Sequence, residues 1–104
     1  MKLCRIGELD KEKPAIIDKD GSYKDLSSVI PDLNPENLNF ETIEKLNKLD
    51  LKDLPTIDKN SRIGACVKNP SKFLGIGLNF KDHATEQNLP IPKEPIIFSK
   101  FTNC

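Results

Sequence analysis

The dipeptide Asp20-Gly21 constrains the fold of this chain more than any other local feature. Asp-Gly supplies the positive φ values that a type I′ turn requires, and that turn matches the right-handed twist of paired strands. Strand-like segments flank the dipeptide, at residues 15–18 on one side and 22–25 on the other. We therefore predict a β-hairpin closed by a two-residue turn at Asp20-Gly21, with an exposed loop as the alternative.

A regular apolar spacing predicts a helix in the first sixty residues. Four apolar residues recur every three positions: Phe40, Ile43, Leu46 and Leu49. This spacing is typical of an amphipathic helix of about ten residues, and we expect its apolar stripe to face the core rather than to dock a partner. The dipeptide Asn34-Pro35 is suited to cap a turn that precedes the helix.

Short apolar segments predict further strands, at residues 2–6, 62–67, 73–78 and 96–98. The segment 73–78 is interrupted by Gly75 and Gly77, which predicts a buried strand with close backbone approach. A dinucleotide-binding loop would need a third glycine at position 80, where the sequence has phenylalanine. The G-x-G-x-x-G interpretation is therefore excluded.

Charge and cysteine content exclude several classes of protein. The 16 basic and 16 acidic residues leave a net charge of zero, which disfavours a dedicated nucleic-acid binder. The apolar runs are too short for a membrane span, and the N-terminus lacks the apolar core of a secretory signal. Cys4, Cys66 and Cys104 are odd in number and lack C-x-x-C spacing, so neither a disulfide framework nor a zinc site fits. We expect a reduced, cytoplasmic protein without a nucleic-acid or membrane partner.

The zero net charge hides an asymmetry that predicts two parts. Residues 1–60 carry 10 basic and 13 acidic residues, whereas residues 61–104 carry 6 and 3. We place the boundary at the polar stretch 58–61. The carboxylates of the first part are scattered and are expected to form a solvated face, so the sequence indicates no chemistry there.

Reactive side chains crowd together in residues 79–86, directly after the glycine-interrupted strand. If this stretch is helical, His83 and Glu86 lie one turn apart on one face. A carboxylate beside an imidazole makes the histidine a competent general base; the alternative is a surface or capping histidine. Lys100 follows the predicted strand 96–98 and either meets an anionic substrate or is an exposed lysine at the end of a strand.

The run from Ile76 to Glu86, followed by Pro92, Glu94-Pro95 and Phe98–Lys100, closely resembles the fumarylacetoacetate hydrolase family. The opening sixty residues are similar to the small N-terminal region of bacterial members. Those members are called ureidoglycolate lyase or 2-hydroxyhepta-2,4-diene-1,7-dioate isomerase, or cleave 2,4-diketo-3-deoxy sugar acids. The resemblance covers nearly the whole chain and is most specific in residues 76–100.

The resemblance implies a mainly β, α+β fold with short helices. Residues 1–60 would form a small N-terminal hairpin and helix domain, and residues 61–104 the first strands of a rolled β catalytic domain, which is incomplete here. It implies a hydrolase or lyase acting on small 2-oxo or 1,3-dicarbonyl acids. His83 and Glu86 match the catalytic dyad, and Asn79 and Lys100 the substrate-binding positions.

The resemblance also implies magnesium, or manganese or calcium, held by a Glu-x-Glu pair and an aspartate that this chain does not contain. No residue of the chain is therefore predicted as a metal ligand. Phe80 stands where the family has tyrosine. We expect the 104 residues to be a fragment, inactive alone, of an enzyme that is a homodimer at full length. The alternative is an inactive remnant that folds alone or pairs with a partner chain.

Overall fold

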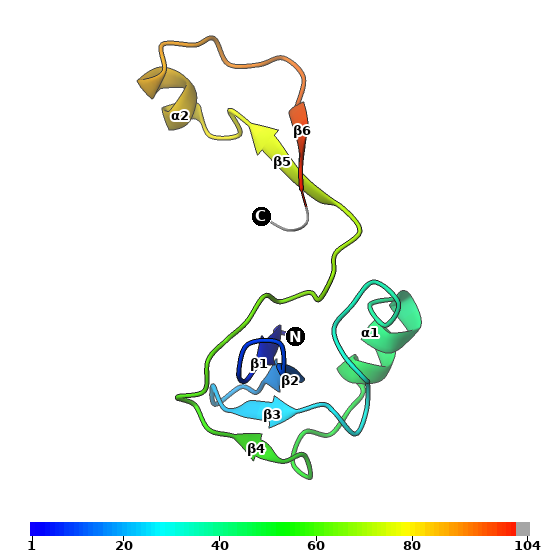
Figure 1. Ribbon diagram of the computed structural model, residues 1–104. Helices are drawn as coiled ribbons and strands as arrows, with labels where there is room; N and C mark the ends of the chain where they lie inside the picture. The colour runs from blue at the N-terminus through cyan, green and yellow to red at the C-terminus, as the bar shows by residue number, and fades with distance from the viewer. Residues whose placement is uncertain (102–104) are drawn as a thin grey trace. The chain divides into compact units, whose positions relative to one another are not determined.

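The computed structural model describes residues 1–101 and divides into two compact units, Met1–Asn69 and a second unit that begins at Pro70 (Figure 1). We call them unit 1 and unit 2. The described residues form two antiparallel sheets and two short helices, so the predicted mainly β fold class is confirmed. The assignment of residues 1–60 and 61–104 to two enzyme domains stays a prediction. Within residues 1–101, neither helix has the length and apolar character needed to cross a membrane.

Unit 1 is built on a four-stranded antiparallel sheet. Its strands follow one another in chain order: β1 (Leu3–Ile6), β2 (Lys13–Ile17), β3 (Tyr23–Asp25) and β4 (Thr56–Ile57). The register pairs Leu3 with Ile16 and Ile17 with Tyr23. The predicted strands at residues 2–6, 15–18 and 22–25 are therefore confirmed, and Pro14 lies inside β2.

The β2–β3 hairpin is closed by a three-residue turn, so the predicted two-residue turn is wrong. The Asp18 N–H donates to the Ser22 carbonyl oxygen (2.9 Å), and the Gly21 N–H donates to the Asp18 carbonyl oxygen (3.0 Å). Gly21 has φ of 84°, whereas Asp20 does not adopt a positive φ. A type I′ turn needs positive φ values at both of its central residues. Because only Gly21 has one, the connection is a type I turn followed by a glycine in the left-handed region.

A strap, residues 62–68, joins the two edges of the sheet. Ile63 forms a bridge with Ile6 of β1. On either side of the bridge, the Gly7 N–H donates to the Arg62 carbonyl oxygen and the Gly64 N–H to the Arg5 carbonyl oxygen, both at 2.8 Å. Residues 58–61 connect the strap to β4, which pairs with β3 on the opposite edge.

The predicted strand at residues 62–67 is wrong, because pairing along the strap is limited to this one bridge. Beyond Gly64 the chain leaves β1 and runs to the loop that contains Leu33. There the Lys68 N–H donates to the Leu33 carbonyl oxygen at 2.7 Å. The strap is therefore attached at both ends by main-chain hydrogen bonds without being a strand.

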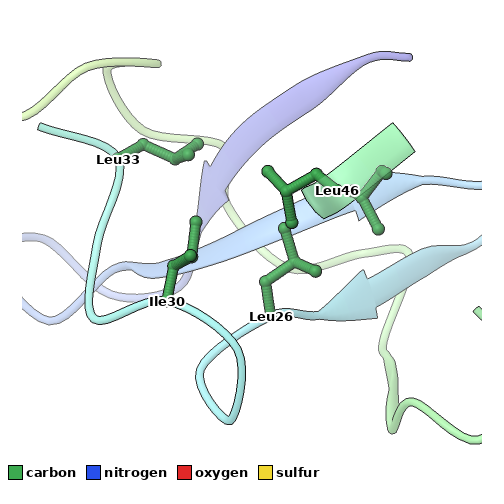
Figure 2. Packing of buried hydrophobic residues seen from close by; sticks show 5 residues of the cluster. Leu26, Ile30, Leu33 and Leu46 are labelled. Carbon is green, nitrogen blue, oxygen red and sulfur yellow. The ribbon is translucent and has the colours of Figure 1, made fainter. Parts of the chain in front are cut away.

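The main core of unit 1 lies between one face of the sheet, the loop after β3 and the helix α1 (Phe40–Asn47). Figure 2 shows how its side chains converge from these elements. Its buried residues are Ile16, Leu26, Ile30, Leu33 and Leu46. A smaller cluster occupies the other face of the sheet, because side chains alternate along a strand. Its buried residues are Cys4, Ile6 and Ala15.

Helix α1 is shorter than its apolar pattern predicts. It begins after Asn39, whose side-chain oxygen accepts the Thr42 N–H at 2.9 Å. Leu46 is buried, but Phe40 is 92% exposed. The predicted core stripe is therefore wrong at Phe40, because this first helical residue lies beyond the reach of the core. Asn34 caps the preceding turn, as predicted, and accepts the Asn37 N–H at 2.9 Å.

Burial distinguishes the cysteines. Cys4 is buried on β1, and burial raises the pKa of its thiol because the thiolate would lose hydration there. Cys66 lies in the strap and is exposed. Both are free thiols. Cys104 lies outside the described residues.

Unit 2 contains a two-stranded antiparallel sheet and one helix. Strand β5 (Phe73–Gly77) pairs with β6 (Ile96–Lys100), and α2 (Lys81–Glu86) lies between them in the chain (Figure 1). The positions of both strands are confirmed. The predicted burial of residues 73–78 is wrong, because apolar side chains of β5 remain exposed. In the described part of this unit, two strands and a six-residue helix do not enclose a core.

Candidate functional site

Helix α2 places the reactive stretch on an exposed surface. Its buried residue is Ala84, while His83 and Glu86 on either side of it in the chain are exposed. The helix ends in a Schellman motif, in which Asn88 adopts a left-handed φ of 52° and the Leu89 N–H donates to the Ala84 carbonyl oxygen at 2.9 Å. The condition set for this stretch, that it is helical, is met by residues Lys81–Glu86, and the C-terminal end of the helix is capped.

The imidazole of His83 contacts Gln87 rather than Glu86. Its Nε2 lies 3.2 Å from the Gln87 amide nitrogen, one helical turn further on. Within the part of the chain that the structure describes, His83 and Glu86 form neither a hydrogen bond nor an ion pair with each other. An amide nitrogen can only donate, so this contact requires Nε2 to accept, which the neutral tautomer with its proton on Nδ1 allows. Sequence reasoning missed Gln87, although its i, i+4 spacing from His83 was the available signal.

The entry to α2 is held in a strained backbone conformation. Leu78, between β5 and the helix, has φ of 48°. A left-handed leucine costs about 1–3 kcal/mol, and such strain tends to persist at functional sites. Asn79 follows directly and is exposed. The strained turn therefore brings Asn79 to the start of the helix that carries His83.

Lys100 lies at the other end of the β5–β6 ladder. Its Nζ lies 5.6 Å from the centroid of the Phe73 ring and 6.0 Å from that of Phe98, a cation–π arrangement. The register pairs Lys100 with Phe73, whereas Gly77, which leads into α2, pairs with Ile96. Four residue steps of about 3.4 Å separate these ends. The structure thus places Asn79 next to α2, which carries His83 and Glu86, and places Lys100 at the other end of the β5–β6 ladder. The roles of these four predicted site residues stay predictions.

A buried ionic network, which sequence reasoning missed, lies in unit 1. Arg5 on β1 is only 5% exposed. Its guanidinium donates to Asp32 through Nε at 2.7 Å and through a terminal nitrogen at 3.2 Å, and it lies 3.4 Å from Glu12. Two cations of the strap complete the network, with Arg62 at 2.7 Å from Glu12 and Lys68 at 3.4 Å from Asp32. We call these five residues the Arg5 network.

The expectation of a solvated carboxylate face is wrong for the two acids of this network. The side chains of Glu12 and Asp32 are only 6% and 13% exposed. The available signal was Arg5 itself, a charged residue between the apolar residues of a predicted strand, which implies buried partners. Those partners come from distant parts of the chain, so local patterns do not reveal them.

Both buried carboxyl groups stay charged near neutral pH. The hydrogen bond from Arg62 is the main cause that lowers the pKa of Glu12. For Asp32, burial acts to raise the pKa, but hydrogen bonds from Arg5 and from the Leu33 N–H, with the charge of Arg5, outweigh it and lower the pKa. The Arg5 network therefore keeps both carboxylates in the form that pairs with Arg5 and Arg62. It is a structural element that attaches the strap to the sheet.

Two other properties of the described residues bear on where a site could lie. A hollow of about 700 Å³ in unit 1 is lined by the two residues before β1, the end of β2 and the residues around and after the end of α1, including Ile16 and Leu46. None of the predicted site residues lines it. Across residues 1–101, no three His, Cys, Asp or Glu side chains gather closely enough to hold a metal ion.

Comparison with known proteins connects the chain to hydrolases. No family model matches it. Proteins from Burkholderia lata and Burkholderia ambifaria are each 47% identical to it over 103 residues, and one from Burkholderia multivorans is 48% identical over the same length. Each carries a provisional name as a hydrolase. The matches cover 99% of this chain and 36% of each relative, so the chain spans about a third of the length of these relatives.

Proposed function

We propose that this chain is the N-terminal part of a fumarylacetoacetate hydrolase-type enzyme that cleaves small 2-oxo or 1,3-dicarbonyl acids. The observation that carries the proposal is the identity with hydrolases over 99% of the chain, which includes the stretch with His83 and Glu86. The exposed position of both side chains on α2 is compatible with a site that faces a substrate. Ureidoglycolate cleavage and isomerisation are the related reactions that the resemblance also allows.

In the proposed reaction His83 acts as a general base. Its imidazole takes a proton from water, and the water oxygen attacks the carbonyl carbon of the substrate. The bond from that carbon to the neighbouring carbon breaks, and its electron pair passes into an enolate. The enolate then takes the proton back from the imidazolium, so protons and electrons balance. General-base catalysis of this kind is worth about 10²–10⁴-fold in rate.

Glu86 is proposed to orient the imidazole, and Asn79 and Lys100 to hold the oxygens of the acid substrate. For Glu86 to do so, the ring of His83 must leave the Gln87 amide, which lies 3.2 Å from its Nε2. Because both side chains are exposed, such a rotation meets little steric resistance. Gln87 thus competes with Glu86 for the same ring.

The metal implied by the resemblance does not fit the described residues. Magnesium is held by a cluster of oxygen ligands, and no such cluster lies within residues 1–101. We therefore place the ligands of a magnesium, manganese or calcium ion outside this chain and derive no step through the ion. Isothermal titration of the 104-residue chain with magnesium should detect no site of micromolar affinity; such a site would mean that the ligands were misplaced.

The experiment that tests the proposal is a chimera. This chain replaces the matching 103-residue region of the Burkholderia lata hydrolase, and turnover is measured against a panel of acylpyruvates and 2-oxo acids with magnesium present. His83→Ala should lower kcat by about 100-fold or more. Glu86→Ala should cost a similar amount, and the double variant little more, because residues that act as a unit are not additive.

Lys81→Ala is the matched control, since Lys81 is exposed on the same helix and outside the proposed site. It should retain the turnover of the unsubstituted chimera. Near-normal turnover of His83→Ala, or fully additive losses in the double variant, would contradict the paired role. A folded chimera without activity, beside an active Burkholderia enzyme, would favour the inactive remnant. Light scattering on the same chimera tests the proposed homodimer.

A further inference from the structure

The hollow of unit 1 has walls that the fold holds in place. The Ile17 N–H donates to the Lys2 carbonyl oxygen at 2.9 Å, which joins the end of β2 to the residues before β1. The Leu49 N–H donates to the Leu46 carbonyl oxygen at 3.4 Å, so the third wall turns where α1 ends. At about 700 Å³ the hollow has the volume of a small-molecule site, for which roughly 300–1,000 Å³ is usual.

The floor of the hollow is aliphatic. Ile16 and Leu46 line it, are only 4% and 2% exposed, and belong to the main core. Leu49 and Leu51 are half-buried, also line it, and pack against the same core. Of the described residues that line the hollow, none is aromatic, so a planar base or ring has nothing to stack on. The floor therefore suits an aliphatic body.

The rim of the hollow carries an excess of positive charge. Its charged side chains are Lys2, Lys19 and Lys52 with Asp18 and Asp50. Residues 1–60 contain 10 basic and 13 acidic residues, so the rim takes three of the 10 basic residues and only two of the 13 acidic ones. Positive charge is thus concentrated here within an acidic part of the chain. A concave surface of one sign raises the local concentration of ions of the opposite sign.

The three lysines of the rim are available to an anion. In the part of the chain that the structure describes, their ammonium groups form neither an ion pair nor a hydrogen bond. The lysine ion pairs of unit 1 involve other residues: Lys11, Lys13, Lys48 and Lys68. The carboxylates of Asp18 and Asp50 each accept a main-chain hydrogen bond already, from the Lys19 N–H at 2.6 Å and the Lys52 N–H at 3.1 Å.

We propose that this hollow binds a free small amphiphile with an aliphatic body and a carboxylate head, of the class of medium-chain fatty acids. The body lies on the floor of Ile16 and Leu46, and the head meets the lysines of the rim. Lysine is a point charge on a flexible stem, so it accommodates a head that is not held in one orientation. The occupant is a free molecule rather than a membrane, because a flat layer of headgroups does not reach a recessed floor.

This inference goes beyond the proposed reaction and does not rest on it. None of the four predicted site residues of unit 2 lines the hollow. Its readout is binding by the chain without turnover. His83→Ala should therefore bind the amphiphile as the unsubstituted chain does, whatever its effect on the reaction, so that the failure of one proposal is distinguishable from the failure of the other.

The test is an amide NMR titration of the full 104-residue chain with sodium octanoate, kept below the concentration at which it forms micelles. Signals of residues that line the hollow, Ile17, Leu49 and Leu51 among them, should shift and saturate. In the series hexanoate, octanoate, decanoate, each pair of added methylenes should tighten binding, by up to about fourfold for each buried methylene. Octylammonium, which has the same body and the opposite charge, should not produce these shifts.

Lys19→Gln and Lys52→Gln should each weaken octanoate binding by about two- to fivefold, the usual range for an exposed charge pair, and together by about tenfold. Lys59→Gln is the matched control, because Lys59 is an exposed lysine of unit 1 that does not line the hollow. It should bind octanoate like the unsubstituted chain. The amide spectrum of each variant also shows whether unit 1 is folded.

Three results would overturn the proposal. The first is the absence of saturable shifts at the residues that line the hollow. The second is a folded Lys19→Gln, Lys52→Gln double variant that binds octanoate as tightly as Lys59→Gln does, or octylammonium that binds as tightly as octanoate. The third is that vesicles of anionic lipid produce the shifts while free octanoate does not, since a membrane surface would then be the occupant.

Discussion

The Nε of Arg5 lies 2.7 Å from Oδ1 of Asp32, and the two side chains connect β1 to the loop after β3 across 27 residues of sequence. A second hydrogen bond of 3.2 Å makes the contact bidentate. This geometry holds both groups in fixed positions. Because Lys68 in the strap also reaches Asp32 at 3.4 Å, the pair connects the sheet, the loop and the strap in one arrangement.

The first prediction concerns the energetic role of this pair. Arg5→Met takes the bidentate partner from Asp32, and breaking an ion pair whose arginine is buried costs about 3–5 kcal/mol. We expect a loss near the lower limit, because Arg62 and Lys68 still contact the two acids. Urea unfolding followed by circular dichroism measures it. The double variant Arg5→Met, Asp32→Leu should lose less than the sum of the two single variants.

Lys11→Met is the matched control. Lys11 and Glu8 form an exposed pair, with side chains 77% and 80% accessible. Exposed pairs are worth about 0–1 kcal/mol, so this variant should unfold at nearly the same urea concentration as the natural chain. If Arg5→Met and Lys11→Met lost the same free energy of unfolding, the buried pair would stabilise the fold no more than the exposed pair does.

The second prediction is a loss of stability in acid. The pKa of Asp32 is lower in the folded chain than its ordinary value. Its charged form therefore favours folding above the unfolded-state pKa of about 3.9. This contribution decreases as the pH falls through that value and is lost below the folded pKa. Glu12 acts in the same direction.

Urea unfolding at a series of pH values between 3 and 7 measures this dependence. Stability should be level near neutral pH and decrease steeply below about pH 4.5, where both acids begin to bind protons in the unfolded chain. Asp32→Asn should be less stable at pH 7 and should show a shallower decrease. If the stability of Asp32→Asn decreased with falling pH as steeply as that of the natural chain, other carboxyl groups would be the cause of the decrease.

The third prediction tests the corrected turn. Gly21 has φ of 84°, and a Cβ added there would meet nothing within 4 Å. Gly21→Val should therefore destabilise unit 1 through backbone conformation alone, by about 1 kcal/mol or more. Gly21→Asn should cost less, because asparagine tolerates the left-handed region. Thermal unfolding of the two variants compares them, and equal losses would indicate a steric cause that the structure does not contain.

The fourth prediction concerns the tautomer of the single histidine. In the free chain, Gln87 donates to Nε2 of His83, so the neutral ring should carry its proton on Nδ1. Nitrogen-15 NMR distinguishes the two ring nitrogens directly. Gln87→Ala should shift the tautomer balance, whereas Glu86→Gln should leave it unchanged in the absence of substrate. A balance that responds to Glu86 and not to Gln87 would contradict the observed contact.

The sequence predicted those features that neighbouring residues determine. Asp20-Gly21 located the hairpin, the spacing of Ile43 and Leu46 located α1, and the stretch around His83 is helical over Lys81–Glu86. The turn type was missed, because Asp-Gly is compatible with two turns and pairing of Asp18 with Ser22 selects one. Local sequence does not determine which register the two strands adopt.

Features that depend on distant residues were not predictable in this way. Arg62 lies 50 residues from Glu12, so the charge pattern gave no indication that they pair. The strap has an apolar pattern suited to a strand, yet its contact with Leu33 draws it away from β1. The contact of His83 with Gln87 likewise depends on which rotamer the ring adopts, and the sequence offered both Glu86 and Gln87 within one turn.

The strap of unit 1 covers part of the β1 edge of its sheet. Its bridge at Ile63 engages main-chain groups of β1 that would otherwise face water, so an incoming strand finds little to pair with there. In the described part of unit 2, by contrast, β5 and β6 each pair on one side only. Exposed edges next to apolar faces template intermolecular sheets. On heating or concentration, cross-β aggregation of this chain should therefore begin at residues 73–77 and 96–100, and a fragment that ends at Asn69 should resist it.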